Sequence, residues 1–297
     1  MKILIALLFS LLLTACSASP AQEEQVLPET PVEQELLLEQ PVPPQERAIR
    51  YEADTTLFAD TLYAEDGTQL LHYAVHIPYL SAWREDGTEI TEARNEPEEK
   101  ALAAVQTFND RFAVWHSEEV IRETTNAALM DLTWYQEEQL DWYDGYWMEL
   151  NCTVYQTEHL ISISGVYVAY TGGAHPNTYL LGWTFDLERG AFFGAETLAG
   201  QEPFQTAVSE EIIRQAEVKA AEYDAAPEEF FWPEYETIIG DWPSYAISFD
   251  ESGMSVAFSP YELAAYAAGP QTFELSYEFL KPYLDEHGLE VLGLDEE

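Results

Sequence analysis

Apolar and polar residues alternate from about residue 50 onward, which predicts a β-hairpin at the start of the folded part of the chain. Its strands are expected at Tyr51–Tyr63 and Gln69–Leu80, because successive side chains of a strand point to opposite faces of a sheet. The sequence Glu65-Asp66-Gly67 between them contains residues typical of a tight turn.

Two later segments repeat apolar residues at every third or fourth position, which predicts amphipathic helices. The first is expected to begin near Pro97, since proline suits the first turn of a helix, and to continue towards Leu129. Its apolar face consists of Leu102, Val105, Phe108, Phe112 and Trp115. The second helix is expected at Pro203–Glu222. Its apolar face consists of Phe204, Val208, Ile212 and Ala216.

The remaining segments predict more strands and two short helical pieces around an irregular stretch at residues 223–243. The strands are expected at Gly145–Gln156, Leu160–Tyr170, Thr178–Leu187, Tyr245–Phe249, Met254–Phe258 and Thr272–Leu275. The helical pieces are expected at Pro260–Ala267 and at the C-terminus through Leu284. Strands and helices come in groups, so we predict an α+β fold with antiparallel sheets packed against two longer amphipathic helices. We expect two closely associated subdomains, residues 48–151 and 152–297.

The N-terminus has the pattern of a bacterial lipoprotein signal. Lys2 precedes the apolar run Ile3–Leu13, and Leu13-Thr14-Ala15-Cys16 follows the run directly. An apolar run of this length is typical of a secretory signal and too short to span a bilayer. We therefore predict a signal peptide at residues 1–15 and lipidation of Cys16. The alternative is an ordinary secretory signal in which Cys16 is incidental. Both export the protein, and lipidation would hold it on the outer face of the cell membrane of a Gram-positive bacterium.

Residues 16–47 differ in composition from the rest of the chain. After Cys16 they are rich in Pro, Glu and Gln and contain no aromatic residue. Glutamate repulsion and proline stiffness extend such a segment. We predict a disordered spacer that separates the folded part from the membrane.

The charge is strongly negative. The chain has 12 Lys and Arg against 55 Asp and Glu, a formal net charge of −43. Such a surface repels nucleic acid and anionic lipid headgroups, which excludes both as direct partners, and attracts cations and basic proteins. The alternative is that acidity serves only solubility. Apart from Cys16, the one cysteine is Cys152, expected to be a buried apolar residue, so no disulfide is available within the chain.

Catalytic and metal-binding motifs are not recognisable. His72 and His76 lie in an alternating, strand-like segment, where four residues span about 13 Å, too far for two ligands of one zinc ion. Thr184-Phe185-Asp186 precedes Leu187 and so lacks the second aspartate of a polysaccharide deacetylase. A carboxylate pair cannot be selected among so many acids. We therefore predict neither a metal nor a cofactor, and a protein that is not an enzyme.

The segment Tyr170–Asn177 is the most distinctive motif. Gly172 and Gly173 permit positive φ angles, and Pro176 ends any hydrogen-bonded ladder. A tight connection is thus expected to present His175 and Asn177. Two interpretations remain: a structural turn, or a polar recognition corner.

At this motif the chain resembles a bacterial extracytoplasmic domain family of unknown function, found as the outer part of the lysozyme-sensing anti-sigma-V factor. Phe185-Asp186-Leu187 and Gly190 continue the likeness, and a second motif runs from Phe258 to Gly269. Residues 48–151 are similar to the non-catalytic N-terminal domain of the PdaC-type peptidoglycan deacetylases. The motif residues with a possible binding role are Tyr170, Gly172, Gly173, His175, Asn177, Tyr261 and Tyr266.

The resemblance implies a binding role at the cell envelope and carries no catalytic residues. Its ligand is expected to be a basic, lysozyme-like muramidase, which the acidic surface would complement. The alternatives are a peptidoglycan or glycan-binding module and, less favoured, an unrecognised cell-wall hydrolase. Transmembrane and catalytic segments of the relatives are not found, so we expect a tethered binder. The aromatic residues proposed for contact are Trp142, Trp147, Phe231 and Trp232.

Overall fold

The structure is a computed structural model that describes residues 49–140, 142–199 and 202–295. All of them belong to one compact unit, Arg47–Glu297. The predicted signal peptide, Cys16 and the spacer lie outside the described residues. Among the helices that the structure describes, none is long and apolar enough to cross a membrane.

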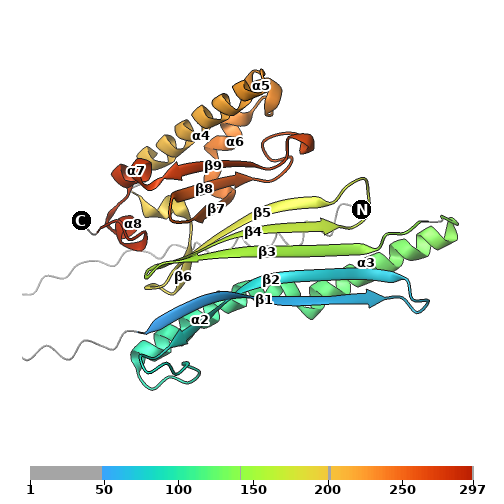
Figure 1. Cartoon of the computed structure of the whole chain (residues 1–297), viewed down its shortest axis with the longest axis horizontal. Coiled ribbons are helices and arrows are strands. Elements are labelled where there is room, and N and C mark those ends of the chain that lie inside the picture. The colour runs from blue at the N-terminus through green and yellow to red at the C-terminus, as the bar shows by residue number, and fades with distance from the viewer. Residues whose placement is uncertain (1–48, 141, 200–201, 296–297) are drawn as a thin grey trace, which may run out of the picture. The chain divides into compact units, whose positions relative to one another are not determined.

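A six-stranded sheet is the centre of this unit, with strand order β1-β2-β3-β4-β5-β6 (Figure 1). The strands are β1 (Arg50–Tyr63), β2 (Gln69–Trp83), β3 (Tyr146–Gln156), β4 (Leu160–Tyr170), β5 (Asn177–Asp186) and β6 (Ala191–Phe193). All neighbours are antiparallel except β2 and β3, which pair in parallel from Leu71 opposite Tyr146 to Val75 opposite Leu150. The expected antiparallel pairing holds throughout this sheet except at this one pair. The strand direction is retained because a helical crossover joins β2 to β3.

The crossover consists of α2 (Glu96–Ala113), the 3₁₀ turn η1 (Val114–His116) and α3 (Glu118–Glu137). The side chain of Asn95 caps α2 by accepting a hydrogen bond from the Glu98 amide at 2.9 Å. Ser117 caps α3 in the same way at the Val120 amide. A single helix was expected to run towards Leu129, and the structure divides it because the Ser117 cap starts a second helix.

Helix α2 covers one face of the large sheet. Phe108 and Phe112 are fully buried there, in one apolar cluster with Ile161, Ile163 and Phe185 of β4 and β5. Since side chains alternate along a strand, Ser162 points to the opposite face. Its hydroxyl accepts a hydrogen bond from the Phe249 amide at 2.6 Å. The two faces of β4 therefore belong to two different layers.

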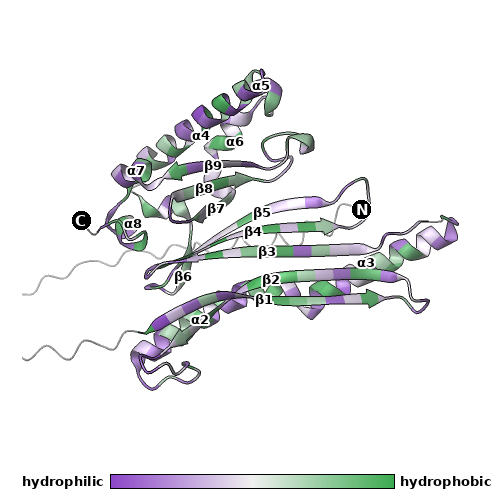
Figure 2. Cartoon of the chain, in the orientation of Figure 1, coloured by the Kyte–Doolittle hydropathy of each residue, from purple (hydrophilic) through white to green (hydrophobic). Residues whose placement is uncertain are grey.

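The second layer is a three-stranded antiparallel sheet covered by α4 (Glu202–Glu222) (Figure 1). Its strands are β7 (Ala246–Phe249), β8 (Gly253–Phe258) and β9 (Gln271–Ser276). Strand β7 crosses β5 closely at Gly182, where an added Cβ would lie 2.1 Å from the Ile247 carbonyl oxygen. Figure 2 shows hydrophilic and hydrophobic residues mixed along α4. Its apolar residues Phe204, Val208, Ile212 and Ala216 are buried, as the periodicity predicts.

Short helices complete the described residues. They are η2 (Ala195–Leu198), α5 (Pro227–Phe230), α6 (Tyr235–Gly240), η3 (Trp242–Ser244), η4 (Tyr266–Ala268), α7 (Tyr277–Leu280), η5 (Lys281–Tyr283) and α8 (Glu286–Val291). Residues 223–243 were expected to be irregular, yet they form α5, α6 and the start of η3 around the buried Trp242. The helix expected at Pro260–Ala267 was wrong: only η4 is helical, because Tyr261 takes a φ of 74°.

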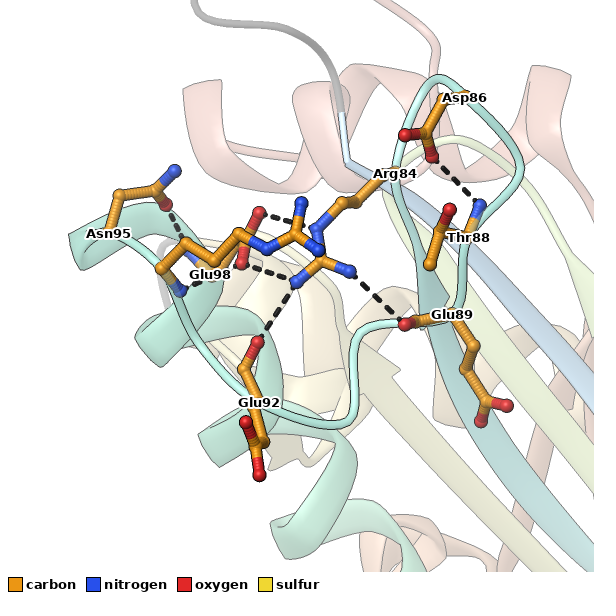
Figure 3. A network of polar contacts seen from close by, with 8 residues as sticks. Arg84, Asp86, Thr88, Glu89, Glu92, Asn95 and Glu98 are labelled. Atoms are coloured by element: carbon orange, nitrogen blue, oxygen red, sulfur yellow. Dashed lines mark hydrogen bonds and ion pairs between the residues drawn. The ribbon is translucent and has the colours of Figure 1, made fainter.

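A buried ion pair holds the loop between β2 and α2. The Arg84 guanidinium donates two hydrogen bonds of 2.8 Å to the Glu98 carboxylate, and both side chains are largely buried. Arg84 also donates to the carbonyl oxygens of Glu89 and Glu92 (Figure 3). One arginine thus fixes the loop and the first turn of α2 together.

The predicted α+β class is confirmed: the sheets are mostly antiparallel and the long helices pack against them. The boundary expected between residues 151 and 152 falls inside β3, in the middle of the large sheet.

Candidate functional site

The motif at Tyr170–Asn177 is the turn between β4 and β5. Gly172 has a φ of 85° and Gly173 a φ of 108°, so both occupy the region that favours glycine. The Tyr170 hydroxyl closes the turn by donating to the Gly173 carbonyl oxygen at 3.1 Å. The tight connection expected from the two glycines is therefore present, and Asn177 begins β5 opposite Ala169.

The second motif, more than 80 residues later in the chain, lies against this turn. The ring of His175 stacks on Tyr266 with centroids 3.9 Å apart and an interplanar angle of 19°. The Tyr266 hydroxyl donates to the Pro176 carbonyl oxygen at 3.2 Å. The Ser259 hydroxyl accepts from the Leu180 amide at 3.0 Å. The fold thus brings the two motifs together in one cluster, which we call the His175 cluster (His175, Tyr261 and Tyr266).

The hydrogen bonds of His175 define its tautomer. Nδ1 lies 2.9 Å from the Pro176 carbonyl oxygen, which only accepts, so Nδ1 carries the proton. In the neutral ring Nε2 then accepts from the Tyr261 hydroxyl, 3.3 Å away. Both ring nitrogens of His175 thus have hydrogen-bond partners, and one ring face stacks on Tyr266. His175 therefore positions Tyr261 and Tyr266.

Tyr261 stands out within this cluster. It is 54% exposed, although its φ of 74° is costly for any residue with a Cβ. The indole nitrogen of Trp232 donates to its carbonyl oxygen at 3.1 Å, and its own amide donates to the Ala264 carbonyl oxygen. The surroundings therefore impose a conformation that presents the phenol ring to solvent.

The C-terminal end of α3 and the segment after it form an exposed aromatic surface. Tyr135 is its centre, with ring centroids 5.1 Å from Trp134, 5.1 Å from Trp142 and 5.5 Å from Tyr143. Trp134 is 53% and Trp142 59% exposed. Met130, four residues before Trp134 on α3, and Leu140 are also exposed. We call this group the α3 aromatic surface (Met130, Trp134, Tyr135, Leu140, Trp142 and Tyr143).

Two hydroxyl groups hold this surface to the fold. Tyr143 donates to the Ala128 carbonyl oxygen at 2.7 Å, and Tyr146 donates to the Asp131 carboxylate at 2.6 Å. Burial raises the pKa of Tyr143 to about 12, and it also raises the pKa of Tyr146, with a further contribution from Asp131. Both hydroxyls therefore stay neutral donors at physiological pH.

The β4–β5 turn also contacts the α3 side. The Tyr170 ring stacks on Trp147 with centroids 6.5 Å apart, and a Cβ at Gly172 would lie 3.6 Å from the Asp131 carboxylate. Burial raises the pKa of Tyr170, and the negative charge of Asp144 raises it further. The turn therefore lies next to Asp131 of α3 at Gly172 and contains His175 of the His175 cluster.

The four aromatic residues proposed for contact differ in their exposure to solvent. Trp142 is exposed, whereas Trp147 and Trp232 are half-buried. Phe231 is 3% exposed and packs with Tyr235 in the core, so its proposed contact role was wrong. Met130 and the anchoring Asp131 were missed. The four-residue spacing of Met130 and Trp134 on a helix could have shown that they share a face.

The sequence segment that contains these aromatic residues has acidic side chains and no Lys or Arg. Residues 123 to 188 contain neither Lys nor Arg. Among the described residues no group of three or more His, Cys, Asp or Glu is arranged to hold a metal ion. His72, for example, contacts the Thr61 hydroxyl at 3.0 Å through Nδ1. The arrangement offers aromatic faces and carboxylates, which suit cationic side chains of a partner.

The described residues thus define an α+β protein with two packed sheets and an aromatic, acidic end. Residues 197–278 match the family DUF3298, described as "Protein of unknown function (DUF3298)". This match identifies a domain of unknown function that includes Tyr261 and Tyr266, while the β4–β5 turn precedes it. No curated protein matches the chain.

Two solved structures are similar. A member of the DUF3298 family from Bacteroides fragilis matches with a TM-score of 0.56 and 12% identity, over 85% of this chain and 100% of that chain. A DUF3298 family protein from Pseudomonas aeruginosa matches with a TM-score of 0.43 and 14% identity, over 80% and 96% of the two chains. The first of these likenesses shows a shared fold.

Proposed function

We propose that this chain is an extracytoplasmic binding lipoprotein that captures a basic protein of the cell envelope, such as a lysozyme-like muramidase. The observation that carries the proposal is the α3 aromatic surface, with Trp134 53% and Trp142 59% exposed in a region without Lys or Arg. Exposed tryptophans are common anchors of protein interfaces, and Arg or Lys of a partner binds well to their ring faces.

Two further observations support it. The net charge of −43 favours encounter with a basic partner. The motifs at Tyr170–Asn177 and Phe258–Gly269 resemble the outer domain of the lysozyme-sensing anti-sigma-V factor, and residues 48–151 resemble the PdaC-type N-terminal domain. On this proposal the chain is not an enzyme and needs no cofactor.

Calorimetry of the full chain with a purified basic lysozyme at low salt tests the proposal. We expect Trp134→Ala and Trp142→Ala each to weaken binding about ten-fold or more, as for central aromatic anchors. Tyr223→Ala is the matched control, since Tyr223, directly after α4, is 65% exposed and lies outside the surface. Absence of binding by the unsubstituted chain, or equal losses in all three variants, would contradict the proposal.

The glycan-binding alternative gives a different result in a second assay. Aromatic stacking on sugar rings is insensitive to salt, whereas attraction between charged proteins is screened. Retention of the chain on insoluble peptidoglycan at high salt, with no lysozyme binding, would favour the glycan-binding module. Release of muropeptides from the same material would favour the hydrolase.

The lipid anchor is tested separately. We expect the chain expressed in a Gram-positive host to incorporate a radiolabelled fatty acid and to fractionate with membranes. Cys16→Ser should abolish both and release the protein, because the thioether cannot form, while Cys152→Ser should change neither. Labelling of the Cys16→Ser variant would show that another residue carries the lipid.

A further inference from the structure

A cavity of about 290 Å³ lies where the end of α2 meets the edge of both sheets. Its walls include Trp183 of β5, Phe192 and Phe193 of β6, and Tyr245 and Ile247 from the start of the small sheet. The volume lies just below the ~300–1,000 Å³ typical of small-molecule sites. The cavity belongs neither to the α3 aromatic surface nor to the His175 cluster.

The short strand β6 explains why this space is open. It pairs only with Thr184–Asp186, so the edge of β5 continues beyond it at Trp183 and Gly182. Gly182 lets β7 approach the β5 backbone directly. Two rings at β6 and one at Tyr245 border the remaining gap, so aromatic side chains form part of its lining beside polar groups.

One cationic group lines the cavity. Arg111, in the last turn of α2, is exposed, with its guanidinium carbon 5.6 Å from the centroid of the Phe192 ring. Among the described residues it has no carboxylate partner and no hydrogen bond. An unpaired guanidinium is notable in a chain with 55 acidic and 12 basic residues, and its planar fork fits a carboxylate.

A second observation limits the charge of the ligand. The carboxylate of Glu196 lies beside Gly194, which also lines the cavity, and its buried Oε2 has no hydrogen-bond partner. Glu196 does not itself line the cavity, but its negative charge next to the lining disfavours a second anionic group on the ligand. The cavity therefore has aromatic walls and one anion-binding group in its lining, and a neighbouring carboxylate repels additional negative charge.

We propose that this cavity binds a small aromatic monocarboxylate, with its ring between Trp183, Phe193 and Tyr245 and its carboxylate on Arg111. This function is independent of the capture of a basic protein, because none of these residues belongs to the α3 aromatic surface. The ligand has one ring, since the volume admits little more.

Titration of the full chain with phenylacetate, followed by ¹H–¹⁵N spectra of the tryptophan indoles, tests the proposal. We expect the Trp183 signal, assigned with Trp183→Phe, to shift on titration. The neutral analogue phenylacetamide should bind about ten-fold or more weakly, because it lacks the charge that Arg111 recognises.

Arg111→Gln should reduce the affinity for phenylacetate to that for phenylacetamide and leave the neutral analogue unaffected. Arg122→Gln is the matched control, since it makes the same change of net charge on α3, outside the cavity. Thermal melts confirm that both variants fold. Equal binding of the two probes, equal effects of the two variants, or no shift of Trp183 at millimolar phenylacetate would overturn the proposal.

Discussion

Tyr261 holds a backbone conformation that costs free energy for every residue with a Cβ. Its φ of 74° lies in the left-handed region, where such residues pay about 1–2 kcal/mol. The ring is 54% exposed, so burial of apolar surface offsets little of that cost. Hydrogen bonds of the Tyr261 amide to Ala264 and of the Trp232 indole to the Tyr261 carbonyl oxygen offset the cost instead.

A pair of substitutions isolates the backbone cost. Tyr261→Gly and Tyr261→Ala both remove the ring; they differ in their tolerance of positive φ and in the backbone freedom of the unfolded chain, which the same exchange at Ala265 measures. We expect the glycine variant to be more stable by about 1 kcal/mol in urea unfolding. At Ala265, where φ is −62°, glycine should give no gain. Equal stability of the two Tyr261 variants would show that the left-handed conformation is not maintained.

At the level of elements, Arg84 and Glu98 connect the β2–α2 loop to α2. Glu98 accepts two hydrogen bonds from Arg84 and one from the Arg94 amide. The hydrogen bonds from Arg84 are the main cause that lowers the pKa of Glu98. A carboxyl group whose pKa is lower in the folded state contributes stability above its unfolded pKa. That contribution is lost as the pH falls through the folded pKa.

The pH dependence of Glu98→Gln tests this connection. At neutral pH the variant should be less stable than the unsubstituted chain, because Arg84 loses its partner in a largely buried site. Between about pH 5 and pH 2 the difference in stability between the two proteins should shrink, since protonation makes the Glu98 side chain neutral, as the glutamine already is. Glu96→Gln is the control, as the Glu96–Lys100 pair is exposed and contributes little. A difference independent of pH would contradict the linkage.

The sequence predicted most elements because each has its own periodicity. Alternation located β1, β2 and β4, and the three-to-four-residue repeat located α4. The parallel pairing of β2 with β3 was missed, although the helical segment predicted between these two strands is the kind of crossover that joins parallel strands. The helix expected at Pro260–Ala267 failed because local propensity yielded to the tertiary contacts of Tyr261.

For the candidate site too, the sequence predicted local features and missed contacts between distant segments. Gly172 and Gly173 predicted the tight connection between β4 and β5. The sequence analysis also singled out both motifs that form the His175 cluster, Tyr170–Asn177 and Phe258–Gly269. Their contact across more than 80 residues of sequence became evident only in the fold. Phe231 and Trp142 are both aromatic residues in acidic segments, and only packing separates the buried ring from the exposed one.

At the scale of the whole molecule, the net charge of −43 destabilises the folded state. Carboxylates held close together in the folded state repel one another, and they move apart when the chain unfolds. Salt screens this repulsion, because the Debye length falls from about 30 Å at 0.01 M to about 8 Å at 0.15 M. Local ion pairs such as Arg84–Glu98 are too few to reverse this balance.

We therefore expect the free energy of unfolding to rise when NaCl increases from about 0.01 M to about 0.15 M, as measured by urea denaturation. Binding of a basic lysozyme should weaken over the same range, since the same screening removes the attraction between the partners. If added salt raises stability while it weakens binding, the loss of binding is caused by charge screening and not by unfolding of the protein. KCl should act like NaCl, and a larger effect of MgCl₂ at equal ionic strength would indicate specific cation binding. A stability that falls with salt would show that attractive pairs, and not the net charge, dominate the electrostatics of the fold.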